Sequence, residues 1–357
     1  MYFTNLSRSG NIPIILLLIF FSALNFSACD RNDDNGPVTE GPATFEWIIA
    51  DYIIDTSVYF SADIAGDFSA VLNMGFCWSE NSSPSLVDNV IFMEEIVPGI
   101  FSFRLTGLQE DRTYFVRAFY TTAENEFYSD EKVFQTTRPV EHNNYSYGIV
   151  RVGNQLWMGE NLRTTTYNNG DDIENGTGMG NYMGMNEPKF YFNYDDSLAY
   201  AADYGLLYTW YVATDSRGIC PDGYRVPDIN DYETLMLHLD PLATPIDDLE
   251  PGEFNISAIA GGMMKATGHQ DDGTGLWEYP NGGADNVTQM SVLPSGLRDP
   301  SGSFAGLGFN AAFWSYTEEN ISRGIMFYMH FFNGAFNTNN FSKKTGYAVR
   351  CMKEADL

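Results

Sequence analysis

Hydrophobic and polar positions alternate along short runs between residues 44 and 138. From Val58 to Ile64 every second residue is apolar, and Ser61 and Asp63 occupy positions between them. This period of two predicts a strand with one buried face. Similar runs separated by turn residues predict strands at 45–51, 71–79, 90–92, 100–105, 113–121 and 132–136. About seven short strands predict an all-β, immunoglobulin-like sandwich.

Two positions in this segment support the same interpretation. Tyr114 follows Leu108 by six residues, the spacing of a tyrosine corner, in which the phenol bonds to upstream backbone. Cys77 has no second cysteine within the segment, so we expect it to be a small buried hydrophobe rather than a nucleophile. We expect no chemistry here and interpret the segment as a spacer or a protein-contact module.

The pattern after residue 145 predicts both strands and helix. Residues 149–158 alternate around Gly153 and Asn154, which predicts a β-hairpin. Further on, Asp228 is a natural helix N-cap and Asp231 occupies the capping-box position. Apolar residues then follow at helical spacing, and Pro241 prevents continuation. These apolar residues are Tyr232, Leu235, Met236 and Leu239. The segment is therefore expected to be α+β, with one or two helices.

The first 28 residues have the order of a signal peptide. Residues 14–24 form an almost unbroken apolar run, too short to span a bilayer comfortably, and small residues follow before Cys29. Small residues directly before a cysteine resemble a bacterial lipobox, although Phe26 departs from the usual aliphatic residue. The resemblance implies that Cys29 is acylated and becomes the mature N-terminus, so that a lipid anchor is the only membrane attachment.

Residues 29–43 contain few residues that could pack, and we interpret them as a flexible acidic tether. The acidic residues just after Cys29 resemble the surface-export signal of Bacteroidetes lipoproteins. The expected location is therefore the outer membrane, exposed at the cell surface. The formal net charge of −28 disfavours nucleic acid as a partner, because a nucleic-acid site needs a basic footprint.

An ordered series of motifs runs through residues 146–354. It includes Gly205-Leu206-Leu207-Tyr208-Thr209-Trp210, Cys220-Pro221-Asp222-Gly223-Tyr224, Leu293-Pro294-Ser295-Gly296-Leu297-Arg298 and Gly346-Tyr347-Ala348-Val349-Arg350-Cys351. The series resembles the Fibrobacter succinogenes major paralogous domain from end to end. It departs from the pattern at Met263, Met264 and Tyr316, and in a longer insert at 242–256. More distantly, the blocks resemble the C-type lectin-like fold and its formylglycine-generating relatives.

Residues 44–138 resemble another kind of module. The stretches Gly75-Phe76-Cys77-Trp78-Ser79 and Tyr114-Phe115-Val116-Arg117-Ala118 are similar to the fibronectin type III-like modules of Bacteroidetes surface proteins. Residues 139–145 would then be a linker. The two resemblances imply an extracellular protein more directly than they imply an activity.

Candidate catalytic groups are scattered. His142, His238, His269 and His330 fall in different predicted elements, with no pair at metal-ligand spacing. Cys220 and Cys351 have two interpretations: a copper-binding pair, as in formylglycine-generating enzymes, or a structural disulfide. We favour the disulfide, because one cysteine precedes the helix, the other lies in the last strand, and exported proteins are oxidised.

Two acidic loops, 171–172 and 271–273, could supply oxygen ligands to Ca²⁺, but neither has EF-hand spacing. We interpret them as solvated turns and expect no cofactor.

The candidate binding site is the loop that contains Trp277, Tyr279, Asn281 and Asp285. Aromatic rings can stack on sugars, while Asn and Asp side chains bond to hydroxyl groups. The alternative for Trp277 is a core position that anchors the loop, and Trp314 and residues 327–332 are expected to build the core.

The preferred function is thus a noncatalytic surface binding or adhesion lipoprotein whose partner is a glycan or a protein. The alternatives are an enzyme related to formylglycine-generating proteins and a structural subunit of a surface assembly.

Overall fold

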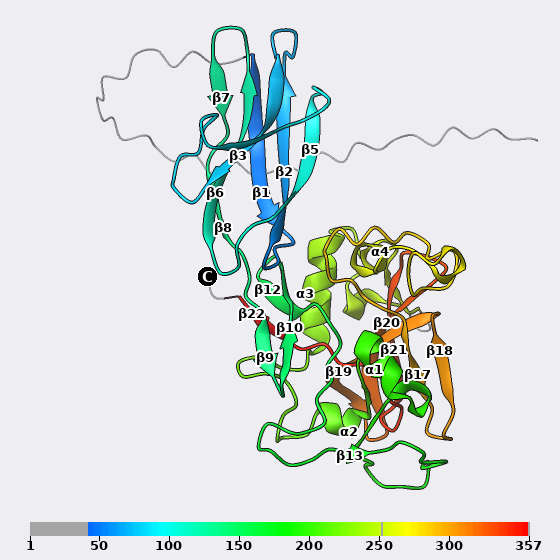
Figure 1. Ribbon diagram of the computed structural model, residues 1–357. Coiled ribbons are helices and arrows are strands. Elements are labelled where there is room, and N and C mark those ends of the chain that lie inside the picture. Colours follow the sequence, from blue (N-terminus) through cyan, green and yellow to red (C-terminus); the bar gives the residue numbers. More distant parts are fainter. Residues whose placement is uncertain (1–41, 251–252, 356–357) are drawn as a thin grey trace, which may run out of the picture. The chain divides into compact units, whose positions relative to one another are not determined.

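The computed structural model describes residues 42–250 and 253–355 (Figure 1). The expected signal peptide, Cys29 and nearly all of the expected tether lie outside these described residues. The strands up to residue 158 are β1 Ala43–Asp51, β2 Ser57–Gly66, β3 Asn73–Ser79, β4 Asn89–Phe92, β5 Gly99–Thr106, β6 Thr113–Thr121, β7 Glu126–Tyr128, β8 Lys132–Gln135, β9 Val140–His142, β10 Tyr145–Tyr147, β11 Ile149–Val152 and β12 Gln155–Met158.

The later strands are β13 Glu174–Asn175, β14 Phe190–Phe192, β15 Leu207–Tyr208, β16 Asn255–Ser257, β17 Ser295–Arg298, β18 Phe304–Leu307, β19 Asn310–Asn320, β20 Arg323–His330, β21 Phe336–Ser342 and β22 Met352–Glu354. The α-helices are α1 Leu198–Tyr204, α2 Trp210–Ala213, α3 Ile229–Leu239 and α4 Ala260–Met264. Short 3-10 helices cover Tyr194–Asp196, Ile246–Asp248 and Gln270–Asp272.

Two antiparallel sheets form the first module. One has the strand order β1–β2–β5, and the other has the order β4–β3–β6–β7 with β8 also paired to β6. Their inner faces share one core, in which the rings of Phe60 on β2 and Phe76 on β3 lie 5.4 Å apart. All seven predicted strands are present. Strand β7 was not predicted, because its three residues are too few to show a period of two.

The two local predictions for this module are confirmed. The hydroxyl of Tyr114 accepts a hydrogen bond from the backbone nitrogen of Gln109, as in a tyrosine corner. Cys77 is fully buried and free, and its thiol donates to the carbonyl of Arg117. Burial raises the pKa of this thiol to about 11, which makes it a poor nucleophile at neutral pH.

The second module is built around the antiparallel sheet β16–β21–β20–β19. The predicted hairpin is present as β11–β12, and β22 from the chain's end pairs with β12. A core rich in aromatic and methionine side chains lies between these strands and helix α3 (Figure 1). Trp157 and Trp277 are among its largest fully buried side chains, and Trp314 is fully buried in a second core cluster of this module.

Helix α3 has the predicted cap and the predicted buried face. The Asp228 carboxylate accepts from the backbone nitrogens of Asn230 and Asp231, while Asp231 accepts from the backbone nitrogen of Asp228. Three further α-helices of four to seven residues exceed the expected number, since helices this short leave little periodicity to recognise. None of the helices in residues 42–250 and 253–355 is both long and apolar enough to cross a bilayer.

A disulfide joins Cys220 and Cys351, with the Cα atoms 5.8 Å apart at a sequence separation of 131. It ties the chain just before α3 to the chain just before β22. This confirms the staple that we favoured. Both thiols that a copper-binding pair would need are therefore used in the sulfur–sulfur bond.

Candidate functional site

Trp277 lies in the core of the second module and not on its surface. Its side chain is fully buried, and its indole nitrogen donates to the carbonyl oxygen of Val292 over 2.9 Å. A ring without an exposed face cannot stack on a ligand. The expected binding role of Trp277 is therefore corrected: the residue anchors the loop from below, which was the alternative.

Asn281 is also turned inward. Its side-chain nitrogen donates to the carbonyls of Ala266 and Gly268 at 2.9 and 2.8 Å, and the residue is buried. Its backbone lies in the left-handed region, with φ of 47°, which asparagine adopts more readily than most residues. The expected contact between this amide and ligand hydroxyls is corrected as well, because the amide nitrogen holds the loop's own backbone.

Tyr279 and Asp285, by contrast, are exposed. The Tyr279 ring packs edge-on against His269, with ring centroids 5.1 Å apart. The Asp285 carboxylate accepts from the backbone nitrogen of Val287 at 2.9 Å, as in a tight turn. Of the four predicted binding residues, Tyr279 is the one that offers an aromatic ring to solvent.

Two other segments bring further aromatic rings beside this loop. The backbone nitrogen of Glu278 donates to Gly308, that of Gly282 to Phe331, and that of Phe331 to Phe309. We define the aromatic face as Tyr279, Phe309, Phe331 and Phe332. Tyr279, Phe309 and Phe332 have 58%, 42% and 55% of their surface exposed.

The aromatic face corrects the expectation that all of residues 327–332 belong to the core. Phe327 and Met329 are buried, as expected, but the chain leaves the sheet after His330 and Phe332 then points to solvent. The rings of Phe309 and Phe331 meet edge-on with centroids 5.2 Å apart. Sequence reasoning missed Phe309, Phe331 and Phe332, although their place beside glycines in turns was a usable signal.

Helix α4 is the platform on which these segments pack. A Cβ atom on Gly261 would lie 2.2 Å from the carbonyl oxygen of Ala335, and one on Gly262 would lie 2.1 Å from that of Gly283. Such distances are far below van der Waals contact, so both positions require glycine. The paired glycines of the sequence therefore let the loop and the β20–β21 turn approach one helix closely.

Lys265, directly after α4, joins the same segments from inside. Its ammonium donates to the carbonyls of Gly282, His330 and Asn333 at 2.9, 3.1 and 2.9 Å, and its side chain is fully buried. The nitrogen also lies 5.0 Å from the centre of the Trp277 ring, within the range of a cation–π contact. One charged group thus holds the Tyr279 loop and the turn bearing Phe331 and Phe332.

The electrostatics of this region follow from burial. Desolvation lowers the pKa of Lys265 to about 8, so the side chain is still mostly charged at neutral pH. Burial and the charge of Lys265 also lower the pKa of His330. The His330 ring, which lies beside Phe331 and Phe332, therefore does not add a second positive charge next to Lys265 at neutral pH.

One carboxylate in each of the two acidic loops accepts hydrogen bonds from the protein's own side chains. Asp171 accepts from Arg217 and Asn169, and Asp272 accepts from Thr274. Within the described parts of the chain, no three His, Cys, Asp or Glu side chains are grouped so as to hold a metal ion.

Comparison with known families gives one match. Residues 150–353, more than half of the chain, match the model of the Fibrobacter succinogenes major domain. The chain belongs to this family. No curated protein matches the chain. The whole aromatic face, Lys265 and both disulfide cysteines lie inside the residues that match the Fibrobacter succinogenes major domain.

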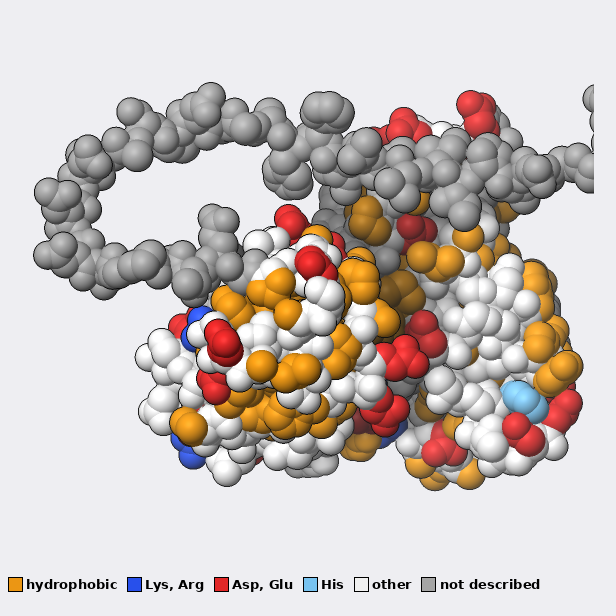
Figure 2. All heavy atoms as spheres, turned by 90° about the horizontal axis from the view of Figure 1, so that it is seen from above, with side chains coloured by type: hydrophobic (Ala, Val, Ile, Leu, Met, Phe, Trp, Pro, Cys, Tyr) orange, Lys and Arg blue, Asp and Glu red, His pale blue; other side chains and the backbone are white. Residues whose placement is uncertain are grey.

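Basic side chains are few in this protein, which has 19 basic and 47 acidic residues. Figure 2 shows one face, on which hydrophobic side chains gather in groups among uncharged and acidic ones, while Lys and Arg are sparse. On this face the exposed hydrophobic groups therefore lie in a mainly neutral or acidic setting.

The positions of Trp277 and Tyr279 predict a large and a small loss of stability, respectively, on alanine substitution. Trp277→Ala should lower the free energy of unfolding by about 3–5 kcal/mol, because it empties a large core site. Tyr279→Ala should change it by less than about 0.5 kcal/mol, because the ring is exposed. Urea unfolding followed by circular dichroism measures both. Equal losses in the two variants would contradict the placement of these side chains.

Proposed function

We propose that this protein is a noncatalytic, lipid-anchored binding protein of the cell surface, and that its second module recognises glycans through the aromatic face. The observation that carries the proposal is the exposure of Tyr279, Phe309 and Phe332 on a support of buried bonds. Solvent-exposed aromatic rings that are held rigidly lose little conformational entropy on binding.

Glycan is favoured over protein as the partner by the polar groups that border the rings. The His269 ring contacts Tyr279, and its Nε2 atom lies 3.2 Å from the Asp272 carboxylate. Glu278 and Asn333 are partly exposed next to the aromatic face. Flat apolar rings combined with nearby hydrogen-bonding groups match a sugar, which has an apolar ring face and an edge of hydroxyl groups.

The folds that we propose for the two modules, and the lipid anchor, agree with this role. We propose that the first module is a fibronectin type III-like sandwich of the immunoglobulin-like class, which would act as a spacer. The second module would be a distant relative of the C-type lectin-like fold. An acylated Cys29 with an acidic tether would hold both modules away from the outer membrane, where extracellular ligands are accessible.

An enzyme related to formylglycine-generating proteins is the less favoured alternative. That chemistry would need Cys220 and Cys351 as free thiols, and the two are joined to each other. The disulfide therefore supports a stabilising role for these cysteines and not a role in catalysis.

The lipid anchor is tested by metabolic labelling. Radiolabelled palmitate should enter the wild-type protein and not Cys29→Ala, because the thiol and the new N-terminus of the mature chain carry the acyl groups. Fractionation should find Cys29→Ala released from the membrane. Label retained in the variant would exclude this cysteine as the anchor.

The aromatic face is tested by a glycan array probed with purified protein. Tyr279→Ala should weaken binding to every glycan that the wild type recognises by about tenfold to a hundredfold, by analogy with aromatic–base stacking worth ~1–3 kcal/mol. Tyr316→Ala is a matched control, because Tyr316 is also a tyrosine with 55% of its surface exposed and lies outside the aromatic face.

Equal effects of Tyr279→Ala and Tyr316→Ala would contradict the proposed site. An array on which the wild-type protein binds no glycan, combined with a protein partner whose capture depends on Tyr279, would replace the glycan by a protein ligand.

A further inference from the structure

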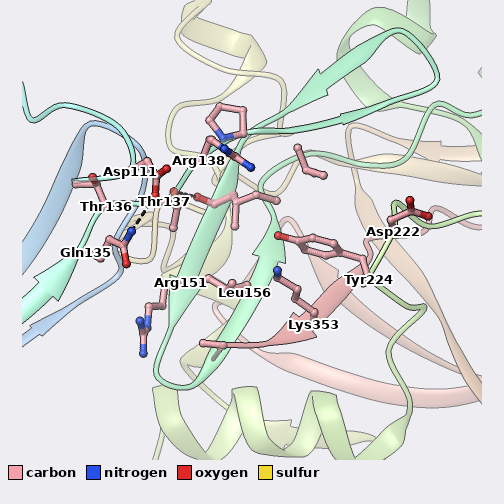
Figure 3. A pocket seen from close by; sticks show the side chains of 14 residues that line it. Asp111, Gln135, Thr136, Thr137, Arg138, Arg151, Leu156, Asp222, Tyr224 and Lys353 are labelled. Carbon is pink, nitrogen blue, oxygen red and sulfur yellow. Dashed lines mark hydrogen bonds between the residues drawn. The ribbon is translucent and has the colours of Figure 1, made fainter. Parts of the chain in front are cut away.

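A cleft of about 450 Å³ lies where the linker that follows β8 meets strands β11, β12 and β22 (Figure 3). The chain is fixed at this point, because the Thr137 hydroxyl donates to the carbonyl of Ile149 at 2.7 Å. None of the residues that line this cleft belongs to the aromatic face. Its volume is within the range of small-ligand sites, which runs from about 300 to 1,000 Å³.

The cleft gathers positive charge in an acidic protein. Arg138, Arg151 and Lys353 line it, although the chain has 47 acidic and only 19 basic residues. Figure 3 shows Arg151 directed away from the centre, and its guanidinium donates to Gly153. Among the described residues, neither Arg138 nor Lys353 forms an ion pair with a carboxylate. Because these two cations are not ion-paired, they favour a negatively charged ligand.

Tyr224 supplies an aromatic ring and a hydrogen-bond donor, its hydroxyl group, beside these cations. Its ring lies under Lys353, with the ammonium 5.1 Å from the ring centre, and Leu156 adds apolar surface nearby. Figure 3 shows the Tyr224 hydroxyl directed into the cleft. Burial raises the pKa of this phenol to about 12, so it remains a hydrogen-bond donor at neutral pH.

The two carboxylates of the cleft differ in whether they are free to accept hydrogen bonds from a ligand. Asp111 accepts from the side chain of Gln135 at 2.8 Å, whereas Asp222 is exposed at the opposite side of Tyr224 (Figure 3). Asp222 would repel a small anion such as phosphate, but it can accept hydrogen bonds from hydroxyl groups. The ligand that fits both sides carries a negative charge at one end and hydroxyl groups at the other.

We propose that this cleft binds an anionic sugar unit. Its carboxylate or sulfate group would lie between Arg138 and Lys353, its apolar ring face would stack on Tyr224, and a hydroxyl would donate to Asp222. A guanidinium matches the paired oxygens of either anionic group. Uronic acids and sulfated sugars share this chemistry and are two possible sources of the ligand.

Isothermal titration calorimetry on the full-length chain in detergent tests the proposal. The probes are tri-galacturonate, a sulfated galactose trisaccharide and neutral galactotriose. At least one anionic probe should bind at least about tenfold more tightly than galactotriose, because each charge-assisted contact contributes more than a neutral one. Binding should weaken when sodium chloride rises from about 50 to about 500 mM, because salt screens the attraction.

Variants then locate the site. Arg138→Gln and Lys353→Gln should each weaken binding of the anionic probe by about tenfold. Lys132→Gln removes the same charge from an exposed position on β8 outside the cleft, and should leave affinity unchanged. Tyr279→Ala should also leave it unchanged, so this site and the aromatic face can fail separately.

The proposal is overturned by equal affinity for galactotriose, by an absence of binding to both anionic probes, or by binding that survives the double variant Arg138→Gln/Lys353→Gln. Binding of inorganic sulfate as tightly as of the sulfated trisaccharide would also overturn it, because the sugar ring would then contribute nothing.

Discussion

The buried ammonium of Lys265 is the interaction on which the candidate site depends. It donates to three backbone carbonyls that belong to two segments distant in sequence, the Tyr279 loop and the turn after β20. Among the described residues no carboxylate pairs with the ammonium. The three carbonyls and the Trp277 ring therefore replace the water that would solvate it on the surface. A buried charge is tolerated only when its hydrogen bonds are complete, which makes the arrangement strongly specified.

This support explains how an irregular region can present a defined surface. Gly261 and Gly262 let the two segments reach α4, Trp277 and Asn281 hold the loop from inside, and Lys265 connects them. The exposed aromatic rings take no part in these bonds and face solvent. The Asn281 side chain and the Lys265 ammonium therefore serve to position backbone, and under the proposed function recognition falls to the exposed rings.

The sequence predicted the regular parts of the fold well, because periodicity and capping act locally. Seven of the eight strands of the first module, the hairpin at β11–β12 and the capped helix α3 follow from such patterns. The roles of Trp277 and Asn281 could not be predicted in the same way, since an aromatic or an amide in a loop has the same local signature whether it faces inward or outward. Phe309 and Phe332 join Tyr279 only through long-range backbone pairing.

Hydrogen–deuterium exchange of Lys265→Met, followed by mass spectrometry, tests the central claim most directly. Three carbonyls would lose their donor, at a cost of about 1–3 kcal/mol for each group left unsatisfied. Amides of residues 278–284 and 331–335 should then exchange faster, while strands β3 and β6 keep their protection. Lys343→Met is the matched control, because Lys343 is also buried but bonds to Glu318. If exchange in the two segments were unchanged in Lys265→Met, or equally faster in Lys343→Met, Lys265 would not be what holds the aromatic face together.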